Sequence, residues 1–127
     1  MQEQHLFEYA VIRVVPRVER EEFLNVGVVL YCAGQKFLSC RYIVDEAKLK
    51  AFGCEPDCEQ LKQYLSAMQR ICAGSPDSGP IGKLGIAERF RWLTAIRSTI
   101  VQTSRVHTGF CHNAGDELAK LFEQLVM

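Results

Sequence analysis

The chain has 127 residues, of which 48% are hydrophobic and 24% charged, as in an ordinary globular protein. Its 15 basic and 15 acidic residues balance, so the overall charge gives no reason to expect duplex DNA or an anionic membrane as a partner. No apolar run approaches the roughly 20 residues that span a bilayer, and the first ten residues lack the pattern of a secretory signal. We therefore expect a single cytoplasmic domain over residues 1–127 that binds neither nucleic acid nor membrane.

Two apolar runs near the amino terminus, residues 9–15 and 23–32, predict the central hairpin of a sheet. Because strand side chains alternate, one face of the second run carries apolar residues alone: Leu24, Val26, Val28, Leu30 and Cys32. The reverse face holds Asn25 and Gly27 in mid-strand, which is typical of a β-bulge or of close approach by another group. Arg13 lies on the reverse face of the first run. We expect any site at this second face.

A turn over residues 33–35 leads to a third predicted strand, residues 37–43. Asp45 is the expected cap of a short helix that ends at Gly53, and residues 56–73 carry apolar positions at helical spacing. The segment 74–85 is rich in Gly, Pro and Ser and reads as a long loop. The six cysteines are expected to be reduced thiols, with Cys32, Cys40 and Cys72 in the core.

The carboxyl-terminal part predicts a helix over residues 86–95, a β-prone run over 99–103 that joins the sheet, and a final helix capped by Asn113 with Asp116. The sequence thus predicts an α+β fold, with an antiparallel sheet of about four strands and three or four helices packed on it. We expect helices on both faces, because the strands are apolar on both sides.

Three pieces of the chain together resemble one bacterial family, the domain of unknown function 3037. They are IRVVPRVEREEFLNVGVVLYC, CAGSPDSGPIGKLGIAERFRWLTA and IRSTIVQTSRVHTG, and the resemblance runs from about Tyr9 to the final helix. Members sometimes lie beside genes for HipA-like kinases, so the resemblance implies such a kinase as a possible protein partner. It also draws attention to particular positions: Glu22, Asn25, Gly27, Gly79, Pro80, Gly82, Glu88, Arg89, Phe90, Trp92, Arg97, Ser98, Thr99, Gln102, Ser104, His107, Thr108 and Gly109. The chain departs from the family pattern at Ile96 and Arg105, where a proline is more usual.

Basic residues concentrate in the segment 83–107, which has five of them against one acidic residue. Within it Arg97, Ser98 and Thr99 place a guanidinium next to two hydroxyl groups, a set suited to phosphate or carboxylate. The hypothesis is a site for an anion or an acidic partner. The alternative is that these arginines are solvated or paired with the protein's own acids.

Other chemistries have weaker signals. The Gly79–Gly82 stretch lacks the ending of a phosphate-binding P-loop and fits a turn with a positive φ angle. Cys54 and Cys58 have no second spaced pair, so we expect no metal site. His107 beside Ser104 fits an acid or base, or a hydrogen-bonded structural residue.

We accordingly expect a non-enzymatic binding module without a cofactor, whose partner meets the basic segment. The candidate binding residues are Arg13, Asn25, Arg89, Arg97, Ser98, Thr99, Gln102 and His107. Asn25 would either hold the strand formed by the basic segment in place or contact a ligand. The alternative function is a small enzyme or nucleotide-handling protein that acts on a phosphorylated substrate through Arg97, Ser98, Thr99 and His107.

Overall fold

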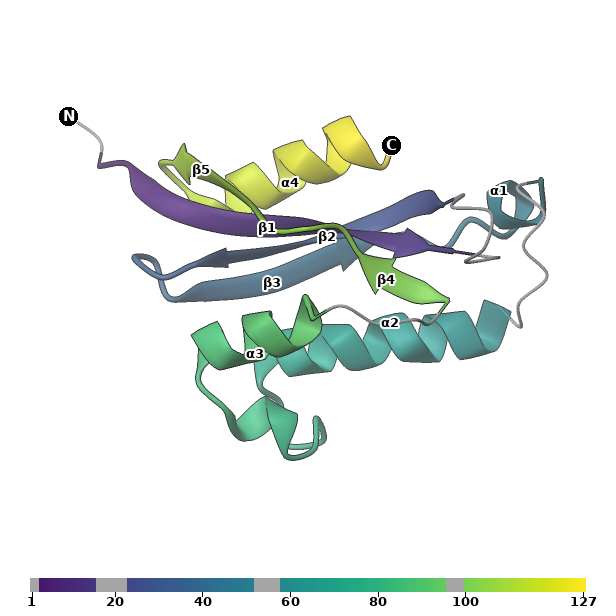
Figure 1. Ribbon diagram of the computed structural model, residues 1–127, viewed down its shortest axis with the longest axis horizontal. Coiled ribbons are helices and arrows are strands. Elements are labelled where there is room, and N and C mark those ends of the chain that lie inside the picture. Colours follow the sequence, from purple (N-terminus) through teal and green to yellow (C-terminus); the bar gives the residue numbers. More distant parts are fainter. Residues whose placement is uncertain (1–2, 16–22, 52–57, 96–99) are drawn as a thin grey trace.

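The protein is built as three layers, with one helix above a sheet and two helices below it (Figure 1). The computed structural model describes residues 3–15, 23–51, 58–95 and 100–127. The helix α4 (Ala114–Leu125) covers one face of the sheet, and α2 (Cys58–Ala73) and α3 (Ile86–Leu93) cover the other. The α+β fold class and the expectation of helices on both faces are therefore confirmed.

The sheet has five antiparallel strands and is centred on the first hairpin. Strands β1 (His5–Val14), β2 (Leu24–Cys32) and β3 (Phe37–Tyr42) form the predicted meander. On its other side β1 pairs with β4 (Val101–Thr103), the predicted β-prone run, and then with β5 (His107–Cys111). Strand β5 is additional to the four strands that the sequence predicts.

The remaining helices follow the sequence closely. Helix α1 (Glu46–Ala51) begins after Asp45, whose Oδ1 accepts a hydrogen bond of 3.0 Å from the Lys48 N–H. At α4, Asn113 Oδ1 accepts from the Asp116 N–H at 2.9 Å, as predicted. The segment 74–85 includes a short 3-10 helix, η2 (Ile81–Lys83), and the expected positive φ angle at Gly79. None of the helices described is both long and apolar enough to cross a membrane.

A β-bulge in β2 changes which residues share a face. Ile12 pairs with Gly27 and Arg13 pairs with Asn25, so Val26 is the extra residue on its strand. Val28, Leu30 and Cys32 pack beneath α4, whereas Val26 packs on the α2 side. The expectation that Leu24, Val26, Val28, Leu30 and Cys32 share one face is therefore wrong. The bulge instead turns Asn25 toward α4, to the same side of the sheet as Arg13.

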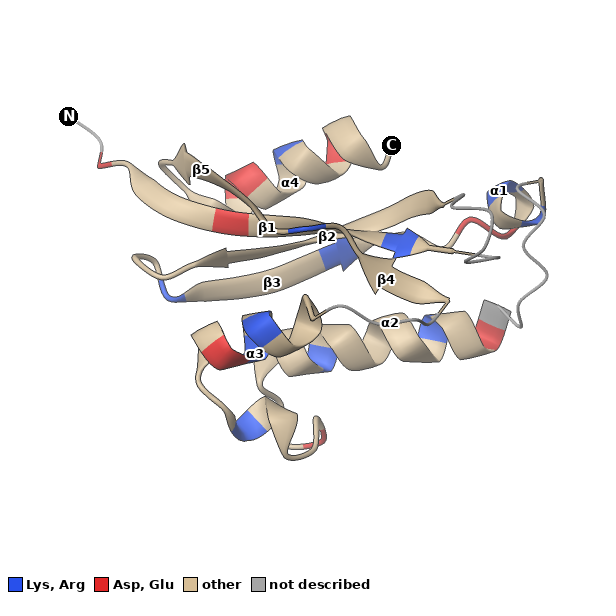
Figure 2. Cartoon of the chain, viewed as in Figure 1, with Lys and Arg blue, Asp and Glu red and all other residues tan. Residues whose placement is uncertain are grey.

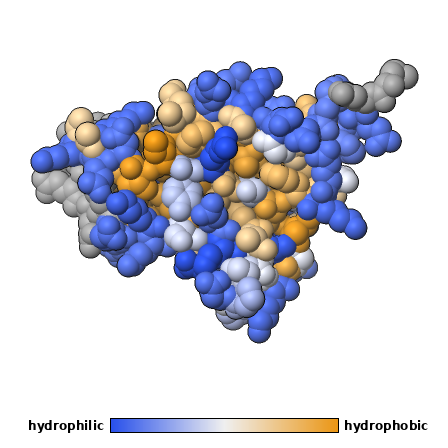
Figure 3. Space-filling model, turned by 180° about the vertical axis from the view of Figure 1, so that it is seen from behind, coloured by the Kyte–Doolittle hydropathy of each residue, from blue (hydrophilic) through white to orange (hydrophobic). Residues whose placement is uncertain are grey.

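Two hydrophobic cores lie on opposite faces of the sheet. The larger core packs Ala10, Ile12 and Val14 of β1 against α2 and α3, and Phe90 in it is fully buried. The smaller core packs β2 and β5 against α4. The outer edge of β3 has no strand partner among the residues described. Seen from behind, hydrophobic side chains form a band across the middle of the molecule, with hydrophilic side chains above and below (Figure 3).

Ser104 joins the two short strands that pair with β1. Its backbone N–H donates to the Val11 carbonyl at 2.8 Å, and its hydroxyl accepts from the Val11 N–H at 2.9 Å. In the hydrogen-bond ladder of the sheet, the hydroxyl therefore replaces a backbone carbonyl as acceptor. Ser104 is buried, with 6% of its surface exposed.

Replacing Ser104 by alanine should lower the free energy of unfolding by about 1–3 kcal/mol, because the buried Val11 N–H would lose its acceptor. Urea denaturation measures the change. The control is Thr108→Ala, at an exposed position of β5, with an expected change below about 1 kcal/mol. Equal losses from the two substitutions would show that the Ser104 hydroxyl has no special role in the sheet.

Candidate functional site

Three of the sequence-predicted site residues form a row across the sheet. Arg13 of β1 lies opposite Asn25 of β2 on one side and opposite Gln102 of β4 on the other. Residues directly opposite in antiparallel strands project from the same face, and here that face is the one covered by α4. All three side chains are half-buried. We call these residues the Arg13 row.

Arg13 is the central residue of the row and is held by an aromatic side chain. Its guanidinium lies 3.9 Å from the ring centroid of Phe23, which is 44% exposed. The Nε atom is buried and has no hydrogen-bond partner in the described structure. Burial lowers the pKa of Arg13 below its usual range, although a guanidinium stays charged at neutral pH. Arg13 is thus a positioned cation with one donor atom that no described residue uses.

One polar atom of the Asn25 side chain forms a hydrogen bond, and the other has no partner among the described residues. Its Nδ2 donates to the Leu125 carbonyl at the end of α4, over 3.1 Å. Its Oδ1 is buried without a partner in the described part of the chain. Asn25 therefore fastens the final helix to the sheet; no hydrogen bond is described between its side chain and β4. With respect to the described residues, Arg13 Nε can still donate a hydrogen bond to a bound group, and Asn25 Oδ1 can still accept one.

Further cations surround the carboxyl-terminal end of α4. Figure 2 shows basic residues on β1, β3 and α1 at this end of the molecule. The Arg41 guanidinium lies 5.9 Å from the ring centroid of Phe122, and Lys48 belongs to α1. Helix α4 has no basic residue in its own last turn, so these cations also complement the partial negative charge of its final carbonyls. Among the described residues, no acidic side chain forms an ion pair with Arg13, Arg41 or Lys48.

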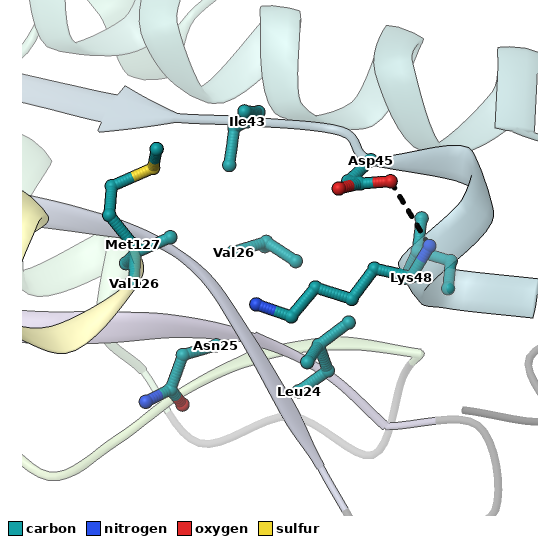
Figure 4. Close-up of a pocket in the computed structure, with 9 residues that line it drawn as sticks. Leu24, Asn25, Val26, Ile43, Asp45, Lys48, Val126 and Met127 are labelled. Atoms are coloured by element: carbon teal, nitrogen blue, oxygen red, sulfur yellow. Dashed lines mark hydrogen bonds between the residues drawn. The ribbon is translucent and has the colours of Figure 1, made fainter. Parts of the chain in front are cut away.

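A small pocket opens beside the Arg13 row (Figure 4). Its volume is about 140 Å³, and Asn25 belongs both to its wall and to the row. The walls come from the start of β2, the link between β3 and α1 together with α1 itself, and the end of α4. They consist of Leu24, Asn25, Val26, Ile43, Asp45, Lys48, Leu49, Val126 and Met127. Sequence reasoning missed this pocket because its residues come from three separate parts of the chain.

A second hollow lies away from the row, next to the turn between β2 and β3. It measures about 310 Å³, and its lining includes His5, Glu8 and Tyr31. Glu8 is already engaged by Arg91 of α3, with Nη1 and Oε1 3.5 Å apart. None of the sequence-predicted site residues that the structure describes lines this hollow, so the Arg13 row and its adjoining pocket form the candidate site.

Two further predicted site residues, Arg89 and His107, lie apart from the row. Arg89 is 8% exposed, and its Nη1 donates to the carbonyls of Ile71 and Cys72, each at 2.9 Å, so it caps α2. His107 pairs with Tyr9 and stacks on its ring, with centroids 5.2 Å apart. The predicted Arg97, Ser98 and Thr99 lie outside the described residues.

The basic segment does not form a single cationic surface in the part that the structure describes. Arg89 points inward to α2, Arg91 contacts Glu8, and Arg105 is exposed beyond β4. The tyrosines of the central hairpin also lie on different sides of the sheet. Tyr31 packs against Phe90, with ring centroids 5.4 Å apart on the α3 side, whereas Tyr9 faces the α4 side.

The cysteines of the two cores are buried free thiols, as expected for Cys32, Cys40 and Cys72. A hydrogen bond with Cys40, together with burial, raises the pKa of Cys72 well above its usual range. Burial raises the pKa of Cys111, with a further contribution from neighbouring Cys32. Such thiols stay protonated and are poor nucleophiles. Among the residues described, no three His, Cys, Asp or Glu side chains are arranged to hold a metal ion.

The fold and the row define an α+β protein with a half-buried arginine at one end of a helix-covered sheet. A family model described as protein of unknown function, DUF3037, matches residues 9–126. The chain belongs to this family, as the three sequence pieces predict. A search of curated proteins found no match, and a search of solved structures found none.

Proposed function

We propose that the protein is a non-enzymatic binding module that holds an acidic group of a protein partner on the Arg13 row. The observation that carries this proposal is a pair of buried polar atoms on directly opposite residues, Arg13 Nε and Asn25 Oδ1, neither of which has a hydrogen-bond partner among the described residues. Buried polar atoms without partners destabilise a protein, so a site that retains two of them is suited to a group that binds there.

A carboxylate fits the donor side of this pair. An arginine side chain offers planar, forked donors to a carboxylate, and stacking on Phe23 holds that plane in place. Arg41 and Lys48 add positive charge at the same end of the molecule. Neither forms an ion pair with an acidic side chain in the described structure. Arginine and exposed aromatic side chains are also enriched at protein interfaces. These features support a protein partner, and a HipA-like kinase is a candidate by family analogy.

The proposal predicts that Arg13→Gln abolishes most binding of an acidic partner. With a glutamate-rich peptide as probe, affinity should fall about tenfold or more, the usual loss when a hydrogen bond to a charged group is removed. Arg105→Gln is the matched control, because Arg105 is exposed outside the row. Arg97→Ala tests the contribution of the basic segment. Fluorescence anisotropy gives the affinities, and affinity capture from the host tests the same variants on natural partners.

The outcomes separate the possible ligands. Loss with Arg13→Gln but not with Arg105→Gln supports the proposal. Equal losses would point to diffuse charge attraction and overturn it. Tighter binding of inorganic phosphate or of a phosphopeptide than of the glutamate peptide, lost with Arg97→Ala, would favour the phosphorylated-substrate alternative instead.

A further inference from the structure

The pocket beside the Arg13 row combines an apolar interior with one cationic side chain. Five of its lining residues are aliphatic and come from three separate parts of the chain: Leu24, Val26, Ile43, Leu49 and Val126. Lys48 extends its ammonium group over the pocket, between Val26 and Asn25 in the view of Figure 4. Asp45 is the only acidic residue among the described lining residues, and its Oδ1 accepts a hydrogen bond from the Lys48 N–H at the start of α1.

The size of the pocket restricts what it can hold. A volume of about 140 Å³ is close to that of an apolar cavity that accommodates benzene, about six heavy atoms. A branched aliphatic side chain fits such a volume. The rim is also apolar, with Ile43 41% exposed and Met127 71% exposed. Exposed hydrophobic side chains around a pocket are typical of a surface that another molecule covers.

The position of the pocket connects it with the proposed acidic partner. Asn25 forms part of the pocket wall and is the direct neighbour of Arg13 in the row. The backbone of Lys48 lies in α1, and its ammonium group reaches across the pocket toward Asn25 and forms no ion pair with an acid among the described residues. A chain that places a carboxylate on Arg13 therefore lies next to both the pocket and a second cation.

Resting on the proposed function, we infer that the pocket binds an aliphatic side chain of the same partner, a peptide segment in which acidic residues flank a leucine, isoleucine or valine. One flanking carboxylate binds Arg13 and the other meets Lys48. The aliphatic side chain contributes affinity by burying apolar surface, and the two cations determine that its neighbours are acidic.

Two synthetic peptides test this inference by NMR titration of the full chain. The first is acetyl-Glu-Glu-Leu-Glu-Glu-amide, and the second replaces its leucine by alanine. We expect the leucine peptide to bind about tenfold more tightly, because three further carbon atoms leave water. We also expect it to shift the amide signals of Val26, Ile43 and Val126. Lys48→Met should weaken the leucine peptide about threefold, while Lys50→Met on the same exposed helix should leave it unchanged.

Each other outcome has a definite meaning. If both peptides bind equally and shift only the signals around Arg13, the pocket inference is wrong and the proposed function stands. If neither peptide shifts any signal of the wild-type protein, the proposed function fails together with the inference. If a glutamine-flanked leucine peptide binds as tightly as the glutamate-flanked one, the pocket is apolar only, and the acidic specificity is overturned.

Discussion

Replacing Arg89 by methionine should lower the free energy of unfolding by about 2–4 kcal/mol. The Ile71 and Cys72 carbonyls, at the end of α2, would lose a charged donor that binds each of them at 2.9 Å. Hydrogen bonds to charged groups contribute more than neutral ones, and methionine keeps most of the side-chain volume while offering no donor. For a domain of this size we expect the melting temperature to fall by about 10 °C.

The matched control for Arg89 is its neighbour on the same helix, Arg91. Arg91 has a side chain that is 65% exposed and contacts Glu8, so Arg91→Met should change stability by less than about 1 kcal/mol. Arg89→Lys should recover part of the loss, because an ammonium group can donate to the same carbonyls. Differential scanning calorimetry compares the four proteins. If the Arg89→Met and Arg91→Met variants have the same melting temperature, the hydrogen bonds from Arg89 to the end of α2 do not stabilise the fold.

The role of Arg89 could not be found from sequence, and the reason is physical. Charged residues mostly lie at the surface, so a count of basic residues between 83 and 107 places Arg89 with Arg97 in an anion-facing segment. In the structure, the chain turns at Gly74 with a positive φ angle and brings the α2 carbonyls onto Arg89. Only the packing of α2 against α3 reveals this contact.

The elements themselves were predictable where the apolar spacing is regular. Strands β1 and β2 and helices α2 and α4 follow from alternation and helical periodicity, and the caps Asp45 and Asn113 follow from residue type. Strand β5 was missed because its sequence, HTGFC, is short, mixed in polarity and interrupted by Gly109. An added Cβ at Gly109 would lie 2.8 Å from the buried Phe7 ring, so a larger residue there requires that ring to shift.

The candidate site was predictable as a set of residues but not as a geometry. Asn25, Gly27 and Arg13 were singled out because polar and glycine residues are unusual in the middle of an apolar hairpin. Gln102 lies beside Arg13 because β4 pairs with β1. The β-prone run predicts a strand that joins the sheet, but it does not predict this register. The pocket, by contrast, needs the end of α4 to meet the start of α1, and no local pattern encodes that meeting.

Substituting Gly27 by alanine should destabilise the protein by about 3 kcal/mol and disturb the Arg13 row. An added Cβ would lie 2.6 Å from the Arg41 carbonyl oxygen and 2.8 Å from the Tyr42 Cβ. Both of these atoms are part of β3 or fixed to its backbone, so the two strands must separate. The Ile43 N–H to Val26 carbonyl bond of 2.8 Å, next to the bulge, would weaken as well.

The control is Gly85→Ala, because an added Cβ there meets no atom within 4 Å and the φ angle of −64° suits alanine. We expect that variant to differ from wild type by less than about 1 kcal/mol in urea denaturation. NMR of Gly27→Ala should show the Asn25 side-chain amide shifted, since the bulge at Val26 turns that amide toward the Leu125 carbonyl. Unchanged Asn25 signals together with wild-type stability would mean that close approach of β3 does not require glycine. In that case the hydrogen bond between Asn25 and the end of α4, and not the close approach of β3, would determine where the bulge lies. The geometry of the Arg13 row would then depend on the final helix.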